Sequence, residues 1–276
     1  MIARREAECC ARARTIVELH CARRASRPQL KRKPLDRSPY VFRESAELYD
    51  LIYSSFKDYS QEARDIALLL GRIHPHCRTI LDVACGTGEH AHLLAADHGL
   101  QVDGLDLDPA FVRIARAKHP VGEFYEADMA DFHLGQRYDA VLCLFSSIGY
   151  LCTLSNVSRA LACFREHLAP GGVVIVEPWF APDVLEPGHT TTRTAEARGL
   201  RVVRVSQTEV QDRLSRLRFD YEIHGPGGVR HATEVHELGL FTTDEMLRSF
   251  EEVGLLAEHD AQGLTGRGLF VAKAAA

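Results

Sequence analysis

The chain has 276 residues, of which 46% are hydrophobic and 26% are charged, a composition that is ordinary for a soluble globular protein. No apolar run approaches the roughly 18–20 residues that a membrane-spanning helix needs, so we predict no membrane segment. Residues 1–44 contain 12 Lys and Arg against 5 Asp and Glu, whereas the remainder contains 21 against 33. The acidic main body argues against a surface that binds a nucleic-acid backbone.

The eight cysteines are scattered, include no Cys-x-x-Cys pair, and are not preceded by a secretory leader. This usage predicts a reducing, cytoplasmic location without a disulfide framework. Residues 1–39 are rich in arginine and lack a sustained apolar period, so we predict a disordered or dispensable basic extension. A nucleic-acid-binding arm is the less favoured alternative. The main domain is expected over residues 40–276.

Apolar spacing predicts that helices and strands alternate from Tyr40 onward. Ser60 is expected to cap the helix that starts at Glu62, and Asp108 the helix that starts at Ala110. In chain order, the predicted elements are helix 44–54, helix 62–73, strand 79–84, helix 89–96, strand 101–107, helix 110–118, strand 123–127, strand 138–145, helix 155–168 and strand 173–176. This order predicts an α/β fold, a doubly wound parallel sheet that binds ligands at the carboxyl ends of its strands.

After Trp179 the pattern changes to an alternation with period two. Segments 201–211, 213–224 and 229–240 each predict an extended strand, and short polar or Gly-Pro turns join them. Residues 188–240 are therefore expected to form an antiparallel β meander inserted into the main domain. A helix over 245–253, capped around Thr243, and a last strand over 267–272 are expected to follow.

A glycine loop follows the first predicted strand. Gly86 and Gly88 allow a tight turn and the close approach of a ligand to backbone N–H groups at the start of a helix. Ala91 stands where a dinucleotide fingerprint has its third glycine, so the loop alone leaves an NAD-type ligand open. The pattern Asp82-x-x-x-Gly86-x-Gly88 resembles the first motif of class I S-adenosylmethionine (SAM) methyltransferases. The resemblance implies that Ala84, Gly86 and Gly88 face the methionine part of SAM.

Acidic residues end the second and third predicted strands. Asp106, 24 residues after Asp82, is expected to accept both hydrogen bonds of a ribose diol, with Leu107 beside it. This role does not separate NAD from SAM. Asp128 and Met129 end the third strand, where class I methyltransferases typically place an acid that takes the adenine amine and a backbone N–H that reaches the ring. The three strand ends together favour a SAM site.

Longer sequence blocks narrow the resemblance to one family. The blocks lie at 57–59, 81–88, 128–132, 145–151, 177–179 and 266–271, and the most restrictive are Ser-Ser-Ile-Gly-Tyr at 146–150 and Gly-Arg-Gly-Leu-Phe-Val at 266–271. They resemble the TDP-amino-sugar N,N-dimethyltransferases, which complete sugars such as desosamine, mycaminose and forosamine in antibiotic pathways. The resemblance runs from about Tyr40 to Lys273. It implies SAM as methyl donor, a nucleotide-linked amino deoxysugar as substrate, no nucleic-acid partner and a homodimer.

Tyr150, at the tip of the fourth predicted strand, is expected to touch the amino group of the sugar. Methyl transfer to nitrogen is an in-line displacement at an already activated sulfonium methyl, so alignment supplies much of the catalysis. A strong base is unnecessary when the free amine binds. We therefore predict no catalytic dyad, with Tyr150 orienting the amine or joining a water relay and Ser147 lining the pocket. The alternative for Tyr150 is a pocket wall without a chemical role.

Four further residues are assigned to the two ligands. Arg267 lies between two glycines that are expected to expose its guanidinium, and this planar fork suits the diphosphate that the resemblance places in the region. A surface salt bridge is its alternative role. Tyr49 and Tyr59 are expected to cover the cofactor and the substrate, respectively. Trp179 is expected to line the substrate cleft, with core packing as its alternative.

None of the 14 histidines shows metal-ligand spacing, so no metal is predicted. Three other functions stay open: a class I methyltransferase acting on another small amine or hydroxyl, an NAD-type oxidoreductase, and a non-catalytic SAM-binding protein. The oxidoreductase is disfavoured because the chain lacks a hydride-handling Tyr-x-x-x-Lys element in a strand context. A nucleic-acid methyltransferase is disfavoured by the acidic main body.

Overall fold

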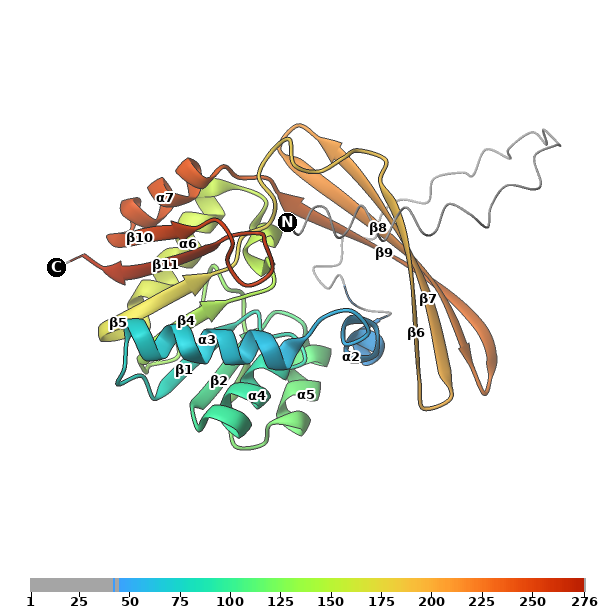
Figure 1. The fold of residues 1–276 in the computed structure, drawn as a ribbon, viewed down its shortest axis with the longest axis horizontal. Helices are drawn as coiled ribbons and strands as arrows, with labels where there is room; N and C mark the ends of the chain where they lie inside the picture. The colour runs from blue at the N-terminus through green and yellow to red at the C-terminus, as the bar shows by residue number, and fades with distance from the viewer. Residues whose placement is uncertain (1–41, 43–44, 276) are drawn as a thin grey trace. The chain divides into compact units, whose positions relative to one another are not determined.

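The computed structural model describes Phe42 and residues 45–275. The predictions for residues 1–39, and the expected start of order at Tyr40, lie outside these residues. The described part contains a seven-stranded sheet and a separate four-stranded antiparallel sheet (Figure 1). The expected fold class, a doubly wound α/β sheet with an antiparallel β meander, is confirmed.

The seven-stranded sheet has the strand order β10-β11-β5-β4-β1-β2-β3. Its strands are β1 (Thr79–Val83), β2 (Gln101–Asp106), β3 (Phe124–Glu126), β4 (Tyr138–Cys143), β5 (Leu168–Val176), β10 (Leu255–Asp260) and β11 (Leu269–Ala274). The first five run parallel to one another. β11 runs antiparallel to both β5 and β10. Strand order reverses at β1 and β4, and the crevice at their carboxyl ends is where such sheets bind ligands.

Helices cover both faces of this sheet (Figure 1). They are α3 (Tyr59–Ile73), α4 (Glu89–His98), α5 (Pro109–Lys118), α6 (Leu154–Glu166) and α7 (Thr243–Glu252). Ile80 of β1 packs in one buried cluster with α3, α4 and α5, while the next residue, Leu81, packs in another with Phe164 of α6 and Phe250 of α7. Successive strand residues therefore bury opposite faces, which explains the nearly continuous apolar runs.

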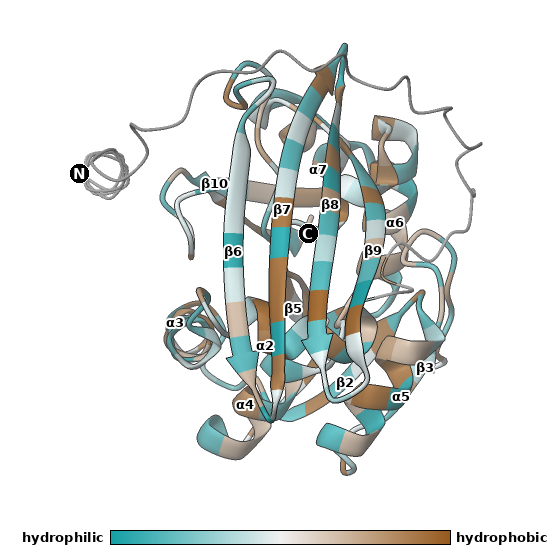
Figure 2. Ribbon diagram, turned by 90° about the vertical axis from the view of Figure 1, so that its right-hand side faces the viewer, coloured by the Kyte–Doolittle hydropathy of each residue, from teal (hydrophilic) through white to brown (hydrophobic). Residues whose placement is uncertain are grey.

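Four long strands form the second sheet, which we call the β lobe. They are β6 (Thr190–Ala197), β7 (Leu200–Gln211), β8 (Leu214–Gly225) and β9 (Gly228–Gly239), each antiparallel to the next. Hydrophobic and hydrophilic bands alternate along β7 and β8 (Figure 2). The three extended segments expected here are confirmed, but the prediction missed β6. This edge strand is mostly exposed and polar, so it carries little alternation.

Helix caps were predicted less well than the helices. Asp58, not Ser60, caps α3, because its side chain accepts the N–H of Gln61. Thr242, not Thr243, caps α7 through a capping box with Glu245. Both errors are small displacements at helix ends. The predicted helix over 44–54 proves to be a 3-10 turn, η2 (Ala46–Leu48), followed by the short helix α2 (Tyr49–Tyr53) within the described residues.

Candidate active site

The glycine loop after β1 needs left-handed backbone conformations. φ is +55° at Ala84, +56° at Gly86 and +73° at Gly88, and α4 begins directly after Gly88. A Cβ on Gly88 would lie 2.9 Å from the Cβ of Ala115 on α5. The loop is therefore packed tightly against α5 and presents backbone N–H groups at the start of α4.

Asp106 ends β2 beside this loop. Its Oδ2 accepts the N–H of Gly86 at 2.8 Å, and its Oδ1 accepts the N–H of Asp108 at 2.9 Å. Burial raises the pKa of Asp106 to about 6. Leu107, the next residue, is 41% exposed. The structure thus brings the predicted residues Gly86 and Asp106 together, and each carboxylate oxygen keeps acceptor capacity for a ligand.

Asp82 lies inside β1, directly below the loop. It is 2% exposed, and its Oδ2 has no hydrogen-bond partner among the described residues. Burial raises the pKa of Asp82 to about 6, and the charge of Asp106 adds to the rise. A buried acceptor without a donor is costly, so this oxygen fits a site that receives a donor from a ligand.

The third predicted strand end is more open. Asp128 is exposed, and its Oδ1 accepts the N–H of Ala130 at 2.9 Å, which closes a small turn after β3. Met129 is half-buried between them. In register Asp106 stands opposite Glu126, so Asp128 follows two residues later at the end of the neighbouring strand.

A polar cluster ties the N-terminal helix α2 to the glycine loop. Lys118 Nζ lies 2.8 Å from Asp50 Oδ2, 2.6 Å from Glu89 Oε2 and 3.2 Å from Thr87 Oγ1. The Thr87 hydroxyl also donates to Asp50. Because Asp50 lies on α2 and Thr87 in the loop, this cluster holds α2, which carries Tyr49, beside the loop.

Tyr49 belongs to an aromatic cluster above the strand ends. Its ring centroid is 4.3 Å from that of Tyr53 and 5.0 Å from that of Phe111. Burial raises the pKa of Tyr49 well above its usual range, and Tyr150 and Asp106 are near enough to add to the rise. Tyr49 is thus an ordered aromatic side chain on the helix that the Lys118 cluster holds beside the glycine loop.

Tyr150 connects the loop after β4 to the β lobe. Its hydroxyl lies 2.8 Å from Nδ1 of His236, a fully buried residue of β9. Burial raises the pKa of Tyr150 and lowers that of His236, so both groups are held neutral. The chain reaches Tyr150 through left-handed φ values of +51° at Phe145 and +64° at Ser146, before the 3-10 turn η3 (Ser147–Leu151). Such strained backbone is typical of functional sites.

Trp179 is turned towards the β lobe. Its indole Nε1 donates to Ser215 Oγ at 2.8 Å. A Cβ on Gly149 would lie 3.0 Å from Trp179 Cβ and 3.1 Å from a methyl of Leu238. Trp179 therefore joins the loop after β5 to the lobe, next to the turn that carries Tyr150.

Arg267 is less exposed than the sequence predicts. Its guanidinium lies 3.3 Å from Oε1 of Glu177, and only 15% of its side chain is accessible. Glu177 is fully buried and also accepts the N–H of Phe145 at 2.7 Å. The guanidinium carbon lies 5.1 Å from the centre of the Phe145 ring. Arg267 is thus an ordered side chain held by a buried carboxylate, which corrects both the exposed position and the surface salt bridge.

A second cation, Lys57, also contacts the ring of Phe145. Lys57 Nζ is 4.1 Å from the Phe145 ring centre and 4.8 Å from that of Tyr59, and it pairs with both oxygens of Glu62. His90 Nε2 lies 3.0 Å from the same carboxylate. Burial lowers the pKa of Lys57. The predicted Tyr59 therefore packs on a buried Lys–Glu–His cluster rather than standing alone.

Sequence patterns assign no role to several of these groups. Lys57 and Glu177 lie within the blocks that carry the family resemblance, so those blocks could have indicated them. His236 gave no signal beyond its residue type, because its partner Tyr150 is 86 positions away in the chain. For Glu62 the sequence indicates only a helical position near the start of α3.

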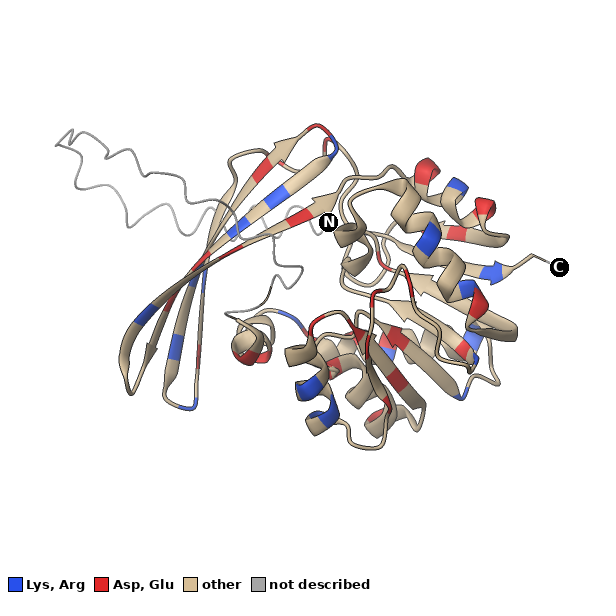
Figure 3. Cartoon of the chain, turned by 180° about the vertical axis from the view of Figure 1, so that it is seen from behind, with Lys and Arg blue, Asp and Glu red and all other residues tan. Residues whose placement is uncertain are grey.

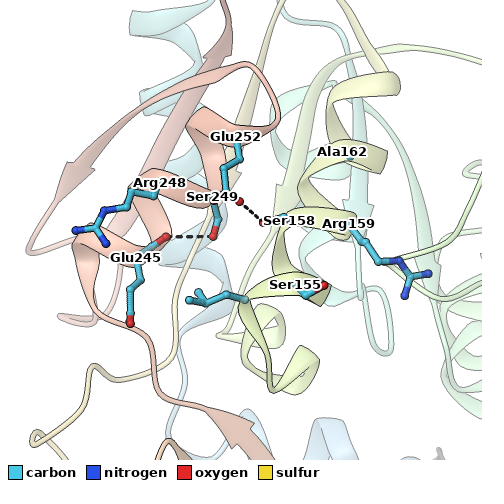
Figure 4. Close-up of a pocket in the computed structure, with 9 residues that line it drawn as sticks. Ser155, Ser158, Arg159, Ala162, Glu245, Arg248, Ser249 and Glu252 are labelled. Carbon is cyan, nitrogen blue, oxygen red and sulfur yellow. Dashed lines mark hydrogen bonds between the residues drawn. The ribbon is translucent and has the colours of Figure 1, made fainter.

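A polar groove of about 660 Å³ lies between α6 and α7, away from these residues (Figure 4). Ser158 donates to Glu252 across it at 3.0 Å. None of the predicted site residues lines this groove.

Within residues 45–275 and Phe42, no group of three or more His, Cys, Asp or Glu is arranged to hold a metal ion. No helix of the described chain combines the length and the apolar character that crossing a bilayer requires. Lys and Arg are interspersed with Asp and Glu along the helices and the β lobe (Figure 3).

Comparison with known proteins places this geometry in a family. Residues 80–172 match the model of a methyltransferase domain. The dTDP-3-amino-3,6-dideoxy-alpha-D-glucopyranose N,N-dimethyltransferase of Streptomyces fradiae is 43% identical over 229 residues, covering 82% of this chain and 89% of that protein. The chain belongs to the TDP-amino-sugar N,N-dimethyltransferase family. It is accordingly a SAM-dependent methyltransferase.

Solved structures of sugar methyltransferases share the fold of this dimethyltransferase family member. The crystal structure of Streptomyces venezuelae DesVI is 39% identical, with a TM-score of 0.80, and the alignment covers 84% of this chain and 99% of that one. The SAM-bound structure of CalS10, an amino pentose methyltransferase from Micromonospora echinaspora, is 35% identical with a TM-score of 0.74, covering 82% and 95%.

Proposed function

We propose that this enzyme transfers two methyl groups in succession from SAM to the amine of a dTDP-linked amino deoxysugar. One observation carries the proposal. Tyr150 lies near Asp106 beside the glycine loop, and its hydroxyl is hydrogen-bonded to His236 in the β lobe. This neutral hydroxyl therefore lies between the proposed SAM site and the proposed sugar site. The 43% identical relative, named for a 3-amino sugar, favours an amine at C3.

The residues around the glycine loop are proposed to bind SAM. Asp106 would accept the ribose hydroxyls, with Leu107 against the adenine and Asp128 and Met129 at its amine and ring. Ala84, Gly86 and Gly88 would leave room for the methionine part, and the unpartnered oxygen of Asp82 fits a cationic donor there. SAM supplies an activated methyl on a positively charged sulfur. Tyr49 is proposed to cover it from α2.

The acceptor amine is proposed to bind against Tyr150. If the tyrosine O–H donates to Nδ1 of neutral His236, its oxygen is left to accept one N–H of the amine. That hydrogen bond would point the nitrogen lone pair at the methyl carbon. After each transfer the nitrogen carries a positive charge, and it loses a proton to water before the next transfer. Alignment, rather than a strong base, is then the main contribution of the protein.

The remaining predicted residues are proposed to hold the rest of the nucleotide sugar. Arg267 would contact the diphosphate, Ser147 and Tyr59 would line the sugar pocket, and Trp179 would brace the pocket wall from the lobe.

Residues 40–276 are proposed to form the methyltransferase domain, with 188–240 as its substrate-facing insert and residues 1–39 not needed for activity. We further propose a homodimer, as the family resemblance implies, and a cytoplasmic location, as the cysteine usage predicts. Light scattering of the purified protein tests the dimer.

The function is tested with the purified enzyme, SAM and a panel of dTDP-3-amino and dTDP-4-amino deoxysugars. Mass spectrometry should show a gain of one and then two methyl units on a 3-amino member. Reactions without SAM and reactions with the corresponding hydroxyl sugars are the controls. The absence of any methyl gain on every amino sugar would sink the proposal, and a gain on 4-amino sugars alone would move the amine to C4.

A further inference from the structure

One inner face of the β lobe carries an unusual set of polar groups. Along β7, Val202 and Arg204 are buried and Ser206 is half-buried, while the residues between them are more exposed, so the three side chains share one face. Arg204 is 5% exposed. In register, Arg204 stands opposite Tyr221, and Ser206 stands opposite Phe219.

Four buried atoms on this face have no hydrogen-bond partner among the described residues. They are Nε and Nη1 of Arg204, Oγ of Ser206 and Nε2 of His236. Buried polar atoms are normally paired, because an unpaired one has lost its hydrogen bonds to water without replacement. A cluster of unpaired donors on one face is therefore expected where a ligand completes the bonding.

Arg204 makes no direct ion pair with a carboxylate of the described residues, although the buried Glu234 lies on the same face. Its guanidinium carbon lies 4.6 Å from the Phe219 ring centre and 5.1 Å from that of Tyr53. The nearby carboxylate of Glu234 accepts both the N–H and the hydroxyl of Ser45. Arg267, by contrast, is paired with Glu177. Arg204 is thus the buried cation of the site that most needs an anion.

Arg204 lies next to the proposed acceptor pocket. Tyr53 contacts Arg204 on one side and packs against Phe145 at 5.3 Å on the other. Phe219 also packs against His236, the partner of Tyr150, at 4.6 Å between ring centres. A ligand group bound at Arg204 would therefore be continuous with an amine bound at Tyr150.

We propose that Arg204 binds the diphosphate of the nucleotide sugar, with Ser206 as a further hydrogen-bond donor. This inference rests on the proposed function. A guanidinium donates charge-assisted hydrogen bonds to phosphate oxygens, and Arg204 has two nitrogens, Nε and Nη1, that lack a partner among the described residues.

The solvent side of Arg204 is covered by Phe56, which is 39% exposed. Its ring centre lies 5.7 Å from the Arg204 guanidinium carbon and 4.1 Å from that of Arg193. Phe56 follows α2 in a turn. Phe56 therefore lies between two arginines, Arg193 and Arg204.

The test compares the full chain with Arg204→Met, Arg204→Lys and the control Arg218→Met, whose arginine pairs with Asp220 on the exposed side of β8. Calorimetry measures the affinities for dTDP, thymidine and SAM, and a thermal melt measures stability. For Arg204→Met we expect dTDP affinity to fall at least tenfold, with thymidine and SAM affinities unchanged. The melting temperature should rise, because an unpaired buried cation has been removed. Arg204→Lys should weaken dTDP binding less, and Arg218→Met should change nothing.

Other results would overturn the inference. Unchanged dTDP affinity in Arg204→Met would remove the phosphate role. A loss of SAM affinity with dTDP affinity intact would assign the arginine to the methionine carboxylate. A lower melting temperature with all affinities reduced would make Arg204 a structural residue. If the Arg204-dependent dTDP binding holds but no amino sugar is methylated, the proposed function fails while this inference stands.

Discussion

The hydroxyl of Tyr150 lies 2.8 Å from Nδ1 of His236 and so bridges two segments that are 86 positions apart in the chain. One partner follows a parallel strand of the main sheet, and the other lies in the middle of an antiparallel strand. Both are held neutral by burial. The bond fixes the turn after β4 to the β lobe.

Removing this bond should slow methyl transfer without abolishing it. For Tyr150→Phe we expect kcat/KM for the amino sugar to fall about tenfold, which corresponds to about 1.4 kcal/mol, a typical cost for one lost hydrogen bond. Steady-state kinetics provide the measurement. The control is Tyr138→Phe, which removes a buried hydroxyl bonded to Asp103 at 2.9 Å at the far end of β4. An equal loss in both variants would indicate a general effect on stability.

The same variant carries a pH prediction. Because burial raises the pKa of Tyr150 and lowers that of His236, neither group changes charge between neutral pH and pH 9. The rise of kcat/KM with pH should then reflect the amine of the substrate alone. Tyr150→Phe should lower the whole profile and keep its shape. Loss of one limb of the profile in the variant would show instead that the pair acts as a base.

Asp106 should control cofactor affinity. For Asp106→Ala we expect the Kd for SAM to rise at least 100-fold, because two hydrogen bonds to a charged acceptor are worth about 1.5–3 kcal/mol each. Calorimetry with SAM measures the change, and a thermal melt confirms that the fold survives. Asp103→Asn, at the opposite end of the same strand, is the control. Unchanged affinity in Asp106→Ala would mean that the ribose site has been misread.

Asp82 should make stability depend on pH. Its pKa rises from 3.8 in the unfolded chain to about 6 in the folded one, so the folded state holds more protons between these values. The free energy of unfolding should therefore fall as pH rises from about 4 to 6. The difference corresponds to about 3 kcal/mol, shared with the neighbouring Asp106 because the two carboxyls titrate together.

Urea denaturation between pH 4 and 7.5 measures this slope. Asp82→Asn should flatten it and should be more stable than the natural protein at pH 7.5, since no charge is then buried. The control Asp97→Asn changes an exposed position of α4 and should keep the natural slope. An unaltered slope in Asp82→Asn would show that Asp82 is not the group that makes the free energy of unfolding depend on pH.

The Lys118 cluster should hold α2 in place over the cofactor loop. For Lys118→Met we expect a three- to tenfold faster release of SAM, because Asp50 and Glu89 lose their shared cation. Stopped-flow fluorescence measures the rate. Arg113→Met is a matched control, since Arg113 on the same helix α5 pairs with Glu47, and both side chains are mostly exposed. Exposed pairs contribute little, so equal effects in the two variants would argue against a specific role.

The sequence predicted the parts of the fold whose signals are local. Apolar runs marked the strands buried on both faces, and the glycines marked the loop that Asp106 contacts. β6 was missed because this exposed edge strand carries little periodicity, and β10 was missed because its sequence, Leu-Leu-Ala-Glu-His-Asp, does not alternate although its burial does. The partners of the site residues were missed for a different reason. Contacts such as Tyr150–His236 and Arg267–Glu177 join distant segments, and no local pattern specifies them.

Gly149 adds a close backbone contact to the Tyr150–His236 hydrogen bond that joins the turn η3 to the β lobe. A Cβ there would meet Trp179, where the chain enters the lobe, and Leu238, where it leaves. The entrance and the exit of the insert thus converge on one residue that has no side chain. A lobe exchanged for that of a relative would have to keep this junction and also the packing of Phe219 and Tyr221 in the cluster that includes Leu48 and Tyr53.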